Sequence, residues 1–315
     1  MKPPFSYYGG KQRLASKLIL LIPKHTVYCE PFAGGATLLF RKPWPKVRDV
    51  NYYREIINDT DGHLTNFFIQ LRDNGEALCR KLSLTLYNQK EYQRAKELDC
   101  EDKLEAARRF FVNVQQGFGN KIDSGWGRGI FGSHEAASYM SSVDRLPEYI
   151  NRIRSIHISC ADALKCIRQW DSPQTFFYCD PPYPGTDQGH YGGYSLDDFH
   201  KLVNTLNEAQ GSFLLSCYDT DKMQVPSGWE RFEFKTICSV SNKSKVNADK
   251  TRKATKEELG NRNRVEVVYR RGSKVPPREE IQKLYDSGDF DCFVNVGYSS
   301  GRRRDLFTNE ELLRR

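Results

Sequence analysis

The sequence predicts an α/β fold with a mostly parallel sheet and a mainly helical segment inserted into it. Three observations support this prediction. Short apolar runs alternate with helical patterns, as they do in parallel sheets. The first run passes through a glycine turn into an apolar stretch with helical spacing. Helical spacing then dominates from residue 62 to about residue 109, and strand-like runs return only after residue 150.

The elements follow in order along the chain. A helix is expected over residues 14–22, because Pro23 cannot continue it, and another begins near residue 36. The expected strands span residues 27–30, 54–58, 156–160, 175–179, 213–216 and 265–269. Several of them run into a carboxylate, at Glu30, Asp59, Asp162 and Asp180. In open α/β sheets, ligands bind outside the carboxyl ends of the strands, so we expect a site there.

This pattern divides the chain into three parts. Residues 1–62 and 151–275 form a discontinuous α/β domain, and residues 63–150 form an inserted domain. Residues 276–315 read as a C-terminal extension with basic ends. The function of this extension does not follow from the sequence.

The composition indicates a soluble globular protein. Hydrophobic residues make up 38% and charged residues 28% of the 315 residues. The longest apolar run, residues 18–22, is far shorter than the roughly 20 residues of a membrane helix. The N-terminus lacks the pattern of a secretory signal, so we expect a cytoplasmic protein. The oligomeric state does not follow from the sequence.

The nine cysteines are scattered and show neither a disulfide framework nor metal-ligand spacing. We therefore expect reduced thiols, mostly buried as small apolar side chains, and no metal site.

The charge distribution indicates contact with a polyanion. The net charge of +8 is only moderately basic, but residues 243–256 hold six basic residues and one acid. Such a segment suits phosphate contacts, and it also suits a solvated loop. The candidates for such phosphate contacts in it are Lys250, Arg252 and Lys253.

The strongest local signal is Asp180-Pro181-Pro182-Tyr183 at the end of an apolar strand. Two consecutive prolines can continue neither a sheet nor a helix interior, so the chain leaves the strand in a stiff extended form. The segment offers a carboxylate and proline carbonyls as acceptors, but no amide donor from either proline. It therefore suits the binding of an amino group, and the Tyr183 ring can stack on a planar base.

A second signal is the turn after the first strand, Glu30-Pro31-Phe32-Ala33-Gly34-Gly35. Its glycines let a ligand lie against the backbone, but it lacks the dinucleotide fingerprint and a phosphate-binding lysine. A cofactor without a pyrophosphate fits better. Asp59 is placed to accept hydrogen bonds from ribose hydroxyls, although a strand-end aspartate is also often a helix cap. Lys11 can reach a carboxylate.

These motifs together resemble the Dam-like group of DNA adenine-N6 methyltransferases. Tyr8-Gly9-Gly10-Lys11, the turn at Glu30, then Asp59, then Asp180-Pro181-Pro182-Tyr183 occur in the order and at the spacing of that family, over about 270 residues. The resemblance implies a Rossmann-like methyltransferase fold with a seven-stranded sheet. It also implies an inserted target-recognition domain carrying a hairpin and S-adenosylmethionine as the methyl donor, with no metal.

The resemblance also implies roles for individual residues. Tyr8, Gly9 and Lys11 would lie at the methionine end of the cofactor. Glu30, Phe32 and Gly34 would line its site, Asp59 would hold the ribose, and Asp162 would lie near the cofactor adenine. The catalytic residues would be Asp180, Pro181, Pro182 and Tyr183. We expect Asp180 and the Pro181 carbonyl to bind the amine of a flipped adenine, which attacks the methyl group directly.

The glycine-rich stretch in the inserted domain is expected to contact the DNA. Six glycines between residues 117 and 132 alternate with aromatic and basic residues, which predicts a loop or hairpin that approaches a partner closely. Its candidate DNA-binding residues are Phe118, Asn120, Lys121 and Arg128. The arrangement that recognises GATC in Dam is not reproduced here, so the recognition sequence stays open. Phe118 and Trp126 would equally suit packing inside a hairpin.

Three alternatives stay open at this point. The enzyme would methylate adenine in RNA or the N4 amine of cytosine in DNA, or the chain would be a catalytically silent DNA-binding homologue. A protein-glutamine methyltransferase fits less well, because the glycine-rich hairpin and the basic loop would serve no purpose in it. The expected partner is double-stranded DNA, and a restriction endonuclease acting on the same site is a second candidate partner.

Overall fold

The structure is a computed structural model of the 315-residue chain. It describes residues 1–7, 9–43, 53–127, 134–186, 191–218, 223–237 and 263–271. Tyr8, Arg128, Lys250, Arg252 and Lys253, which the sequence nominates for cofactor or DNA contact, lie outside the described residues.

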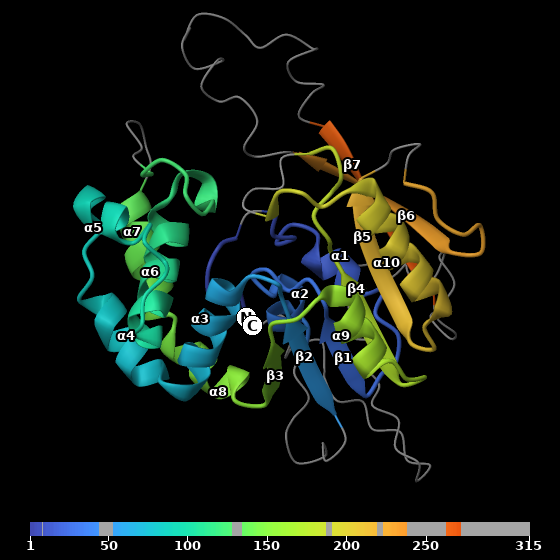
Figure 1. Cartoon of the computed structure of the whole chain (residues 1–315), viewed down its shortest axis with the longest axis horizontal. Helices are drawn as coiled ribbons and strands as arrows, with labels where there is room; N and C mark the ends of the chain where they lie inside the picture. Colours follow the sequence, from blue (N-terminus) through green and yellow to red (C-terminus); the bar gives the residue numbers. More distant parts are fainter. Residues whose placement is uncertain are drawn as a thin grey trace, which may run out of the picture.

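A seven-stranded sheet forms the centre of the α/β part (Figure 1). Its strands are β1 (Val27–Glu30), β2 (Arg54–Asn58), β3 (Ile156–Ser159), β4 (Thr175–Cys179), β5 (Ser212–Tyr218), β6 (Glu230–Ile237) and β7 (Asn263–Arg271). They lie in the order β3-β2-β1-β4-β5-β7-β6. The first five are parallel, and β7 is antiparallel to both β5 and β6. The predicted mostly parallel, seven-stranded sheet is thereby confirmed.

The strands predicted from the sequence agree closely with most of those observed, but one observed strand was not predicted. The bounds of β1, β2 and β4 agree with the prediction, and β5 and β7 extend beyond it at both ends. No strand was predicted at β6. The first helix, α1 (Ala15–Ile19), is shorter than the predicted 14–22 and ends well before Pro23.

The helices fall into two groups along the chain. Beside the sheet strands run α1, α2 (Thr37–Arg41), α9 (Ala163–Trp170) and α10 (Leu196–Glu208). Between β2 and β3 come α3 (Gly62–Asp73), α4 (Gly75–Ser83), α5 (Gln89–Arg94), α6 (Lys103–Gln116), the short 3-10 turn η2 (Phe118–Asn120), α7 (Glu135–Asp144) and α8 (Pro147–Ile153). Figure 1 shows α4 to α7 gathered to one side of the sheet. The division into domains that the sequence suggests stays a prediction.

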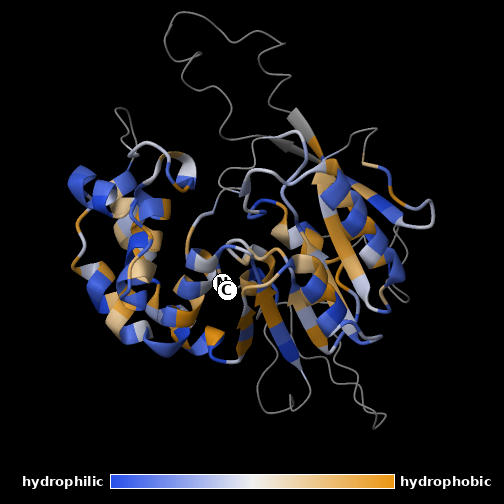
Figure 2. Ribbon diagram, viewed as in Figure 1, coloured by the Kyte–Doolittle hydropathy of each residue, from blue (hydrophilic) through white to orange (hydrophobic). Residues whose placement is uncertain are grey.

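The sheet is buried on both faces, and the alternation of its side chains explains why. Phe176 and Tyr178 of β4 belong to one apolar cluster, together with side chains of α1, α2, α3, α6 and α8. Phe177 and Cys179 belong to a second cluster, together with side chains of α9 and α10. Successive strand residues point to opposite faces, so a strand that is covered on both sides is apolar throughout. Figure 2 shows the resulting apolar strands beneath helices whose outer faces are polar.

A buried ionic cluster ties the inserted helices to the sheet. Glu55 on β2 accepts hydrogen bonds from Lys42, which follows α2, and from Arg152 on α8, with Nζ–Oε1 and Nη2–Oε1 distances of 2.5 and 2.8 Å. All three residues are at most 3% exposed. The two cations hold the pKa of Glu55 at about 2 although burial raises it, so Glu55 stays ionised. Removing one partner would leave a buried charge unbalanced, at a cost of about 3–5 kcal/mol.

Among the described residues, four cysteines are buried and none forms a disulfide. The described residues also contain no cluster of three or more His, Cys, Asp or Glu side chains able to hold a metal ion. We find no described helix with the length and hydropathy needed to span a membrane.

Candidate active site

A cavity of about 900 Å³ opens at the carboxyl ends of the parallel strands. Among the residues that line it are those following β1, β2, β3 and β4, which is where the sequence placed a site. The predicted cofactor and catalytic residues on this wall are Gly9, Lys11, Glu30, Phe32, Gly34, Asp59, Asp162, Asp180, Pro181, Pro182 and Tyr183. One predicted DNA-contact residue, Asn120, joins them. The structure therefore brings residues from distant parts of the chain to one place.

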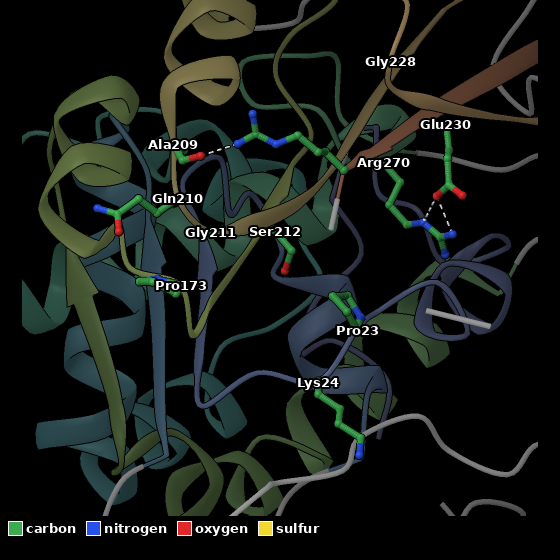
Figure 3. A pocket seen from close by; sticks show the side chains of 11 residues that line it. Pro23, Lys24, Pro173, Ala209, Gln210, Gly211, Ser212, Gly228, Glu230 and Arg270 are labelled. Atoms are coloured by element: carbon green, nitrogen blue, oxygen red, sulfur yellow. Dashed lines mark hydrogen bonds and ion pairs between the residues drawn. The ribbon is translucent and has the colours of Figure 1, made fainter. Parts of the chain in front are cut away.

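A second cavity, of about 430 Å³, lies at the opposite edge of the sheet, near the amino ends of β4 and β5 (Figure 3). Its wall includes Lys24, Ser212 and Arg270. The Arg270 side chain is paired with Glu230 and is only 2% exposed, so it offers little to a ligand (Figure 3). None of the predicted site residues lies here, and the larger cavity is the candidate active site.

Asp180 owes its position to the end of β4. Every residue of β4 is buried, and Pro181 and Pro182 prevent the strand from continuing. The Asp180 carboxylate consequently stands at the sheet edge. Its Oδ1 atom accepts hydrogen bonds from the Lys11 ammonium at 2.8 Å and from the Tyr183 hydroxyl at 2.9 Å.

Tyr183 is held from several sides. Its ring meets Tyr218, the last residue of β5, edge-on at 4.4 Å between ring centroids, and the Lys11 ammonium lies 5.0 Å from its ring centroid. Its hydroxyl has a single hydrogen, which Oε1 of Glu266 at 2.5 Å and Oδ1 of Asp180 share as acceptors. Only 8% of Tyr183 is exposed. The ring is thus fixed at the cavity wall before any substrate arrives.

Glu266 belongs to the same group, and the sequence did not nominate it. It lies on β7, is 4% exposed, and its Oε1 atom is 3.5 Å from Nζ of Lys11. Burial raises the pKa of Glu266 and Asp180 raises it further, against the opposing effect of Lys11. For Lys11, burial lowers the pKa, but Asp180 and Glu266 outweigh burial and hold it above its usual value. Lys11 therefore stays charged.

Glu30 is a buried carboxyl at the end of β1, where the glycine turn begins. Its Oε1 atom accepts hydrogen bonds from the Tyr28 hydroxyl and from the backbone N–H of Leu39, both at 2.7 Å. Burial raises the pKa of Glu30 to about 7, because these hydrogen bonds and Lys42 offset only part of the desolvation. Glu30 therefore changes charge near neutral pH.

Asp59 connects the first two strands of the site. Its Oδ2 atom accepts a hydrogen bond from the backbone N–H of Gly34 at 2.9 Å. Its Oδ1 atom accepts one from the backbone N–H of Asp61 at 3.0 Å and one from the Tyr191 hydroxyl at 2.9 Å. The N-cap of α3 is Asp61, not Asp59, so the strand-end carboxylate does not serve as that helix cap.

Gly34 must be glycine for two physical reasons. Its φ of 47° lies in the left-handed region, and a Cβ there would meet the Tyr7 ring at 3.3 Å. The turn therefore keeps its backbone close to the cavity and to Asp59.

Asp162 lines the cavity but also has a structural role. It is the N-cap residue of α9, and its Oδ1 atom accepts a hydrogen bond from the backbone N–H of Lys165 at 3.0 Å. Phe32 lies nearby on the wall and meets the Tyr194 ring edge-on at 6.2 Å.

The glycine-rich segment forms a tight turn rather than a regular hairpin in the part that the structure describes. An isolated antiparallel bridge joins Gly117 to Trp126, with η2 between them. Phe118 is 64% exposed, so it does not pack inside the turn. Trp126 instead contacts the Tyr87 ring at 5.6 Å. Asn120 reaches the cavity wall, and Lys121 is not among the residues lining it.

The structure adds three residues that the sequence analysis missed. Tyr191 and Tyr218 line the cavity together with Glu266. One signal was available for Glu266, because it is a lone carboxylate within the apolar run of β7. Tyr218 also had a signal, because it ends the apolar run of the parallel strand β5, whereas no comparable pattern marks Tyr191.

The comparison with known protein families decides the class of this site. The model of the D12 class N6 adenine-specific DNA methyltransferases matches residues 7–246. The chain belongs to this family. The match spans Lys11, the turn at Glu30, Asp59 and the Asp180-Pro181-Pro182-Tyr183 segment. The protein is therefore an adenine-N6 DNA methyltransferase, and the prediction of this enzyme class is confirmed.

Individual relatives agree with the family. The type II methyltransferase M1.LlaDCHI of Lactococcus lactis subsp. cremoris is 26% identical over 214 residues, which cover 63% of this chain and 72% of the relative. The type II methyltransferase M.MjaIII of Methanocaldococcus jannaschii is 24% identical over 222 residues, covering 64% and 75%. A solved structure of the rRNA methyltransferase aviRa from Streptomyces viridochromogenes covers 85% of this chain and 88% of its own at 12% identity, with a TM-score of 0.30.

Proposed function

We propose that this methyltransferase binds an adenine extruded from duplex DNA in the 900 Å³ cavity and transfers a methyl group to its N6 amine from S-adenosylmethionine. The observation that carries the proposal is the Asp180 carboxylate, which stands at the cavity wall beside two prolines that offer no amide donors. A site rich in acceptors selects a ligand that brings donors, and the adenine amine brings two.

The residues present fit S-adenosylmethionine on the other side of the cavity. Asp59 is the acceptor for ribose hydroxyls, and the glycine turn at Gly34 leaves room for a ligand beside the backbone. Asp162 lies toward the cofactor adenine, and Gly9 toward the methionine end. Glu30, Asp180 and Glu266 outnumber the nearby cation Lys11, which favours a donor with a net positive charge. When bound, the sulfonium supplies the activated methyl group.

The residues of this chain then act on the amine. Its lone pair is delocalised into the adenine ring, which makes it a poor nucleophile. Hydrogen bonds from the amine to Asp180 and to the Pro181 carbonyl favour a tetrahedral nitrogen with a localised lone pair. The same acceptors stabilise the positive charge that develops on the nitrogen, so their effect is largest in the transition state. The released proton passes to the Asp180 carboxylate.

Tyr183 offsets part of the cost of extruding the base. Unstacking and unpairing one base costs a few kcal/mol. A base stacked on an aromatic side chain gains about 1–3 kcal/mol. Because Tyr218 and Glu266 already fix the Tyr183 ring, little further ordering is needed when the base arrives.

Recognition of the duplex falls to the inserted segment and to the basic residues of the chain. The exposed ring of Phe118 suits insertion between bases, and Asn120 connects the turn to the cavity. Lys121, Arg128, Lys250, Arg252 and Lys253 would contact bases or phosphates. Since the relatives are type II methyltransferases, we place the enzyme in the cytoplasm together with a restriction endonuclease of the same specificity.

The test replaces Asp180 by alanine and follows labelled methyl groups from the donor into duplex DNA. We expect Asp180→Ala to abolish transfer and to leave binding of the cofactor, measured by calorimetry, largely intact. Asp197→Ala on the exposed surface of α10 serves as the matched control and should behave like the wild type.

Nucleoside analysis of the product identifies the acceptor. N6-methyladenine in duplex DNA supports the proposal. Transfer only to RNA or to the N4 amine of cytosine overturns it, and so does full turnover by Asp180→Ala.

A further inference from the structure

The two groups that bind Asp180 have a second acceptor in common. Oδ1 of Asp180 accepts from Lys11 at 2.8 Å and from Tyr183 at 2.9 Å. The same ammonium is 3.5 Å from Oε1 of Glu266, and the same hydroxyl is 2.5 Å from that oxygen. Glu266 thus lies within reach of both donors.

This sharing matters because the proposed function needs the Asp180 carboxylate for the substrate. In the structure, one of its oxygens already accepts from Lys11 and Tyr183, so these donors draw on the negative charge that would bind an incoming amine. A buried ammonium cannot leave its counter-ion without a large cost unless another carboxylate receives it. Lys11 stays charged and is only 11% exposed at its side chain, so water cannot take that place.

We propose that Glu266 is a positioning residue that receives Lys11 and the Tyr183 hydroxyl when the target amine binds Asp180. The inference rests on the proposed function, since it presumes that an amine binds there. The exchange needs only a small movement, because the two Lys11 distances differ by less than 1 Å. No bond is made or broken in it.

The antiparallel strand explains how Glu266 reaches this point. In the sheet register, Glu266 on β7 lies opposite Tyr218 on β5. Cross-strand partners lie on the same face, and Tyr218 packs against the Tyr183 ring. Tyr183 is thus fixed by its ring through β5 and by its hydroxyl through β7. Glu266 is buried and Tyr218 is half-buried, which keeps Glu266 in place during the exchange.

The exchange predicts a specific dependence on pH. Glu266 receives an ammonium ion only when it is ionised, so the rate should rise with pH as Glu266 loses its proton. Burial raises the pKa of Glu266, which moves this rise above the usual range of a glutamate. The titratable and charged groups that face Glu266 are Lys11, Tyr178, Asp180, Tyr183 and Tyr218.

The experiment measures single-turnover methylation of duplex DNA against pH for the wild type, Glu266→Gln and Glu233→Gln. Glu233 is the matched control, because it lies on the neighbouring strand β6 with a side chain that is 52% exposed. We expect Glu266→Gln to lower the rate about 10- to 100-fold with little change in the KM for DNA, below the range of a direct acid–base group. The rate of Glu266→Gln should no longer rise with pH over the range in which Glu266 loses its proton. Glu233→Gln should keep the pH dependence of the wild type.

A second variant guards against a trivial loss of folding. Glu266→Asp keeps the carboxylate, so it should recover part of the rate lost in Glu266→Gln and restore the dependence on pH. A Glu266→Gln enzyme with the wild-type rate and profile, or a Glu266→Asp enzyme that recovers nothing, would overturn the inference. If the wild type itself methylates no adenine, the proposed function fails first; if it does, only the role of Glu266 is at stake.

Discussion

Glu30 offers a direct test of the electrostatics of the site. In the folded protein its pKa is raised from 4.5 to about 7 by burial. The folded state therefore binds a proton more tightly than the unfolded state does. The stabilisation from this proton is complete below pH 4.5 and is lost as the pH rises through 7. A shift of about 2.5 units corresponds to about 3 kcal/mol of unfolding free energy.

The substitution Glu30→Gln removes the titration and keeps the hydrogen bonds. Both the Tyr28 hydroxyl and the Leu39 N–H donate to the same oxygen, Oε1, and an amide oxygen accepts both equally well. We expect the unfolding free energy of the wild type, minus that of Glu30→Gln, to fall by about 3 kcal/mol between pH 4.5 and pH 8. Urea denaturation at half-unit steps of pH measures this difference.

The difference isolates Glu30, because every other titrating group is shared by the two proteins. Glu233→Gln, the same substitution at an exposed carboxylate, is the control over the same range. A flat difference for Glu30→Gln, or a rise with pH, would refute the reasoning that burial dominates at this carboxyl. The same titration should strengthen the binding of a cationic cofactor as the pH rises toward 7, and Glu30→Gln should lack this dependence.

Three further predictions concern the ligands. Tyr191→Phe removes a hydroxyl that competes with ribose for Asp59 and should tighten cofactor binding about fivefold by calorimetry, whereas weaker binding would show that Tyr191 holds the cofactor. Phe118→Ala should slow methylation of duplex DNA more than methylation of a mismatched target, and equal losses would count against insertion of the ring. Replacing Lys250, Arg252 and Lys253 by glutamine should reduce the slope of log affinity against log salt concentration by about 0.9 per lost phosphate contact. An unchanged slope would place these residues away from the DNA.

The parallel part of the site was predictable because its residues obey a simple rule. Glu30, Asp59 and Asp180 each follow a short apolar strand, and parallel strands bring their carboxyl ends to one edge. Glu266 does not obey that rule. It lies near the beginning of β7, and only the antiparallel direction of this strand brings it to the same edge. The direction of a strand is a tertiary property that local pattern does not contain.

The missed strand β6 and the overlong first helix also have physical explanations. The strand β6 alternates charged residues with Phe232 and Phe234, and its position at the edge of the sheet leaves it without the continuous apolar run of a central strand. The apolar run after α1 continues to Ile22, because Leu20, Leu21 and Ile22 are buried in the core outside any helix. These buried residues continue the apolar pattern of α1, so the sequence predicted a helix longer than the one observed.

The wall formed by Gly119 and Asn120 has a consequence for changing the specificity of this enzyme. These two residues belong to the segment expected to face the DNA, yet they also line the cavity that contains Asp180. A graft that replaces this turn with one from another enzyme would reshape the chamber as well as the DNA-facing surface. New DNA specificity would therefore have to be selected together with catalytic activity, because Gly119 and Asn120 contribute to both the turn and the cavity wall.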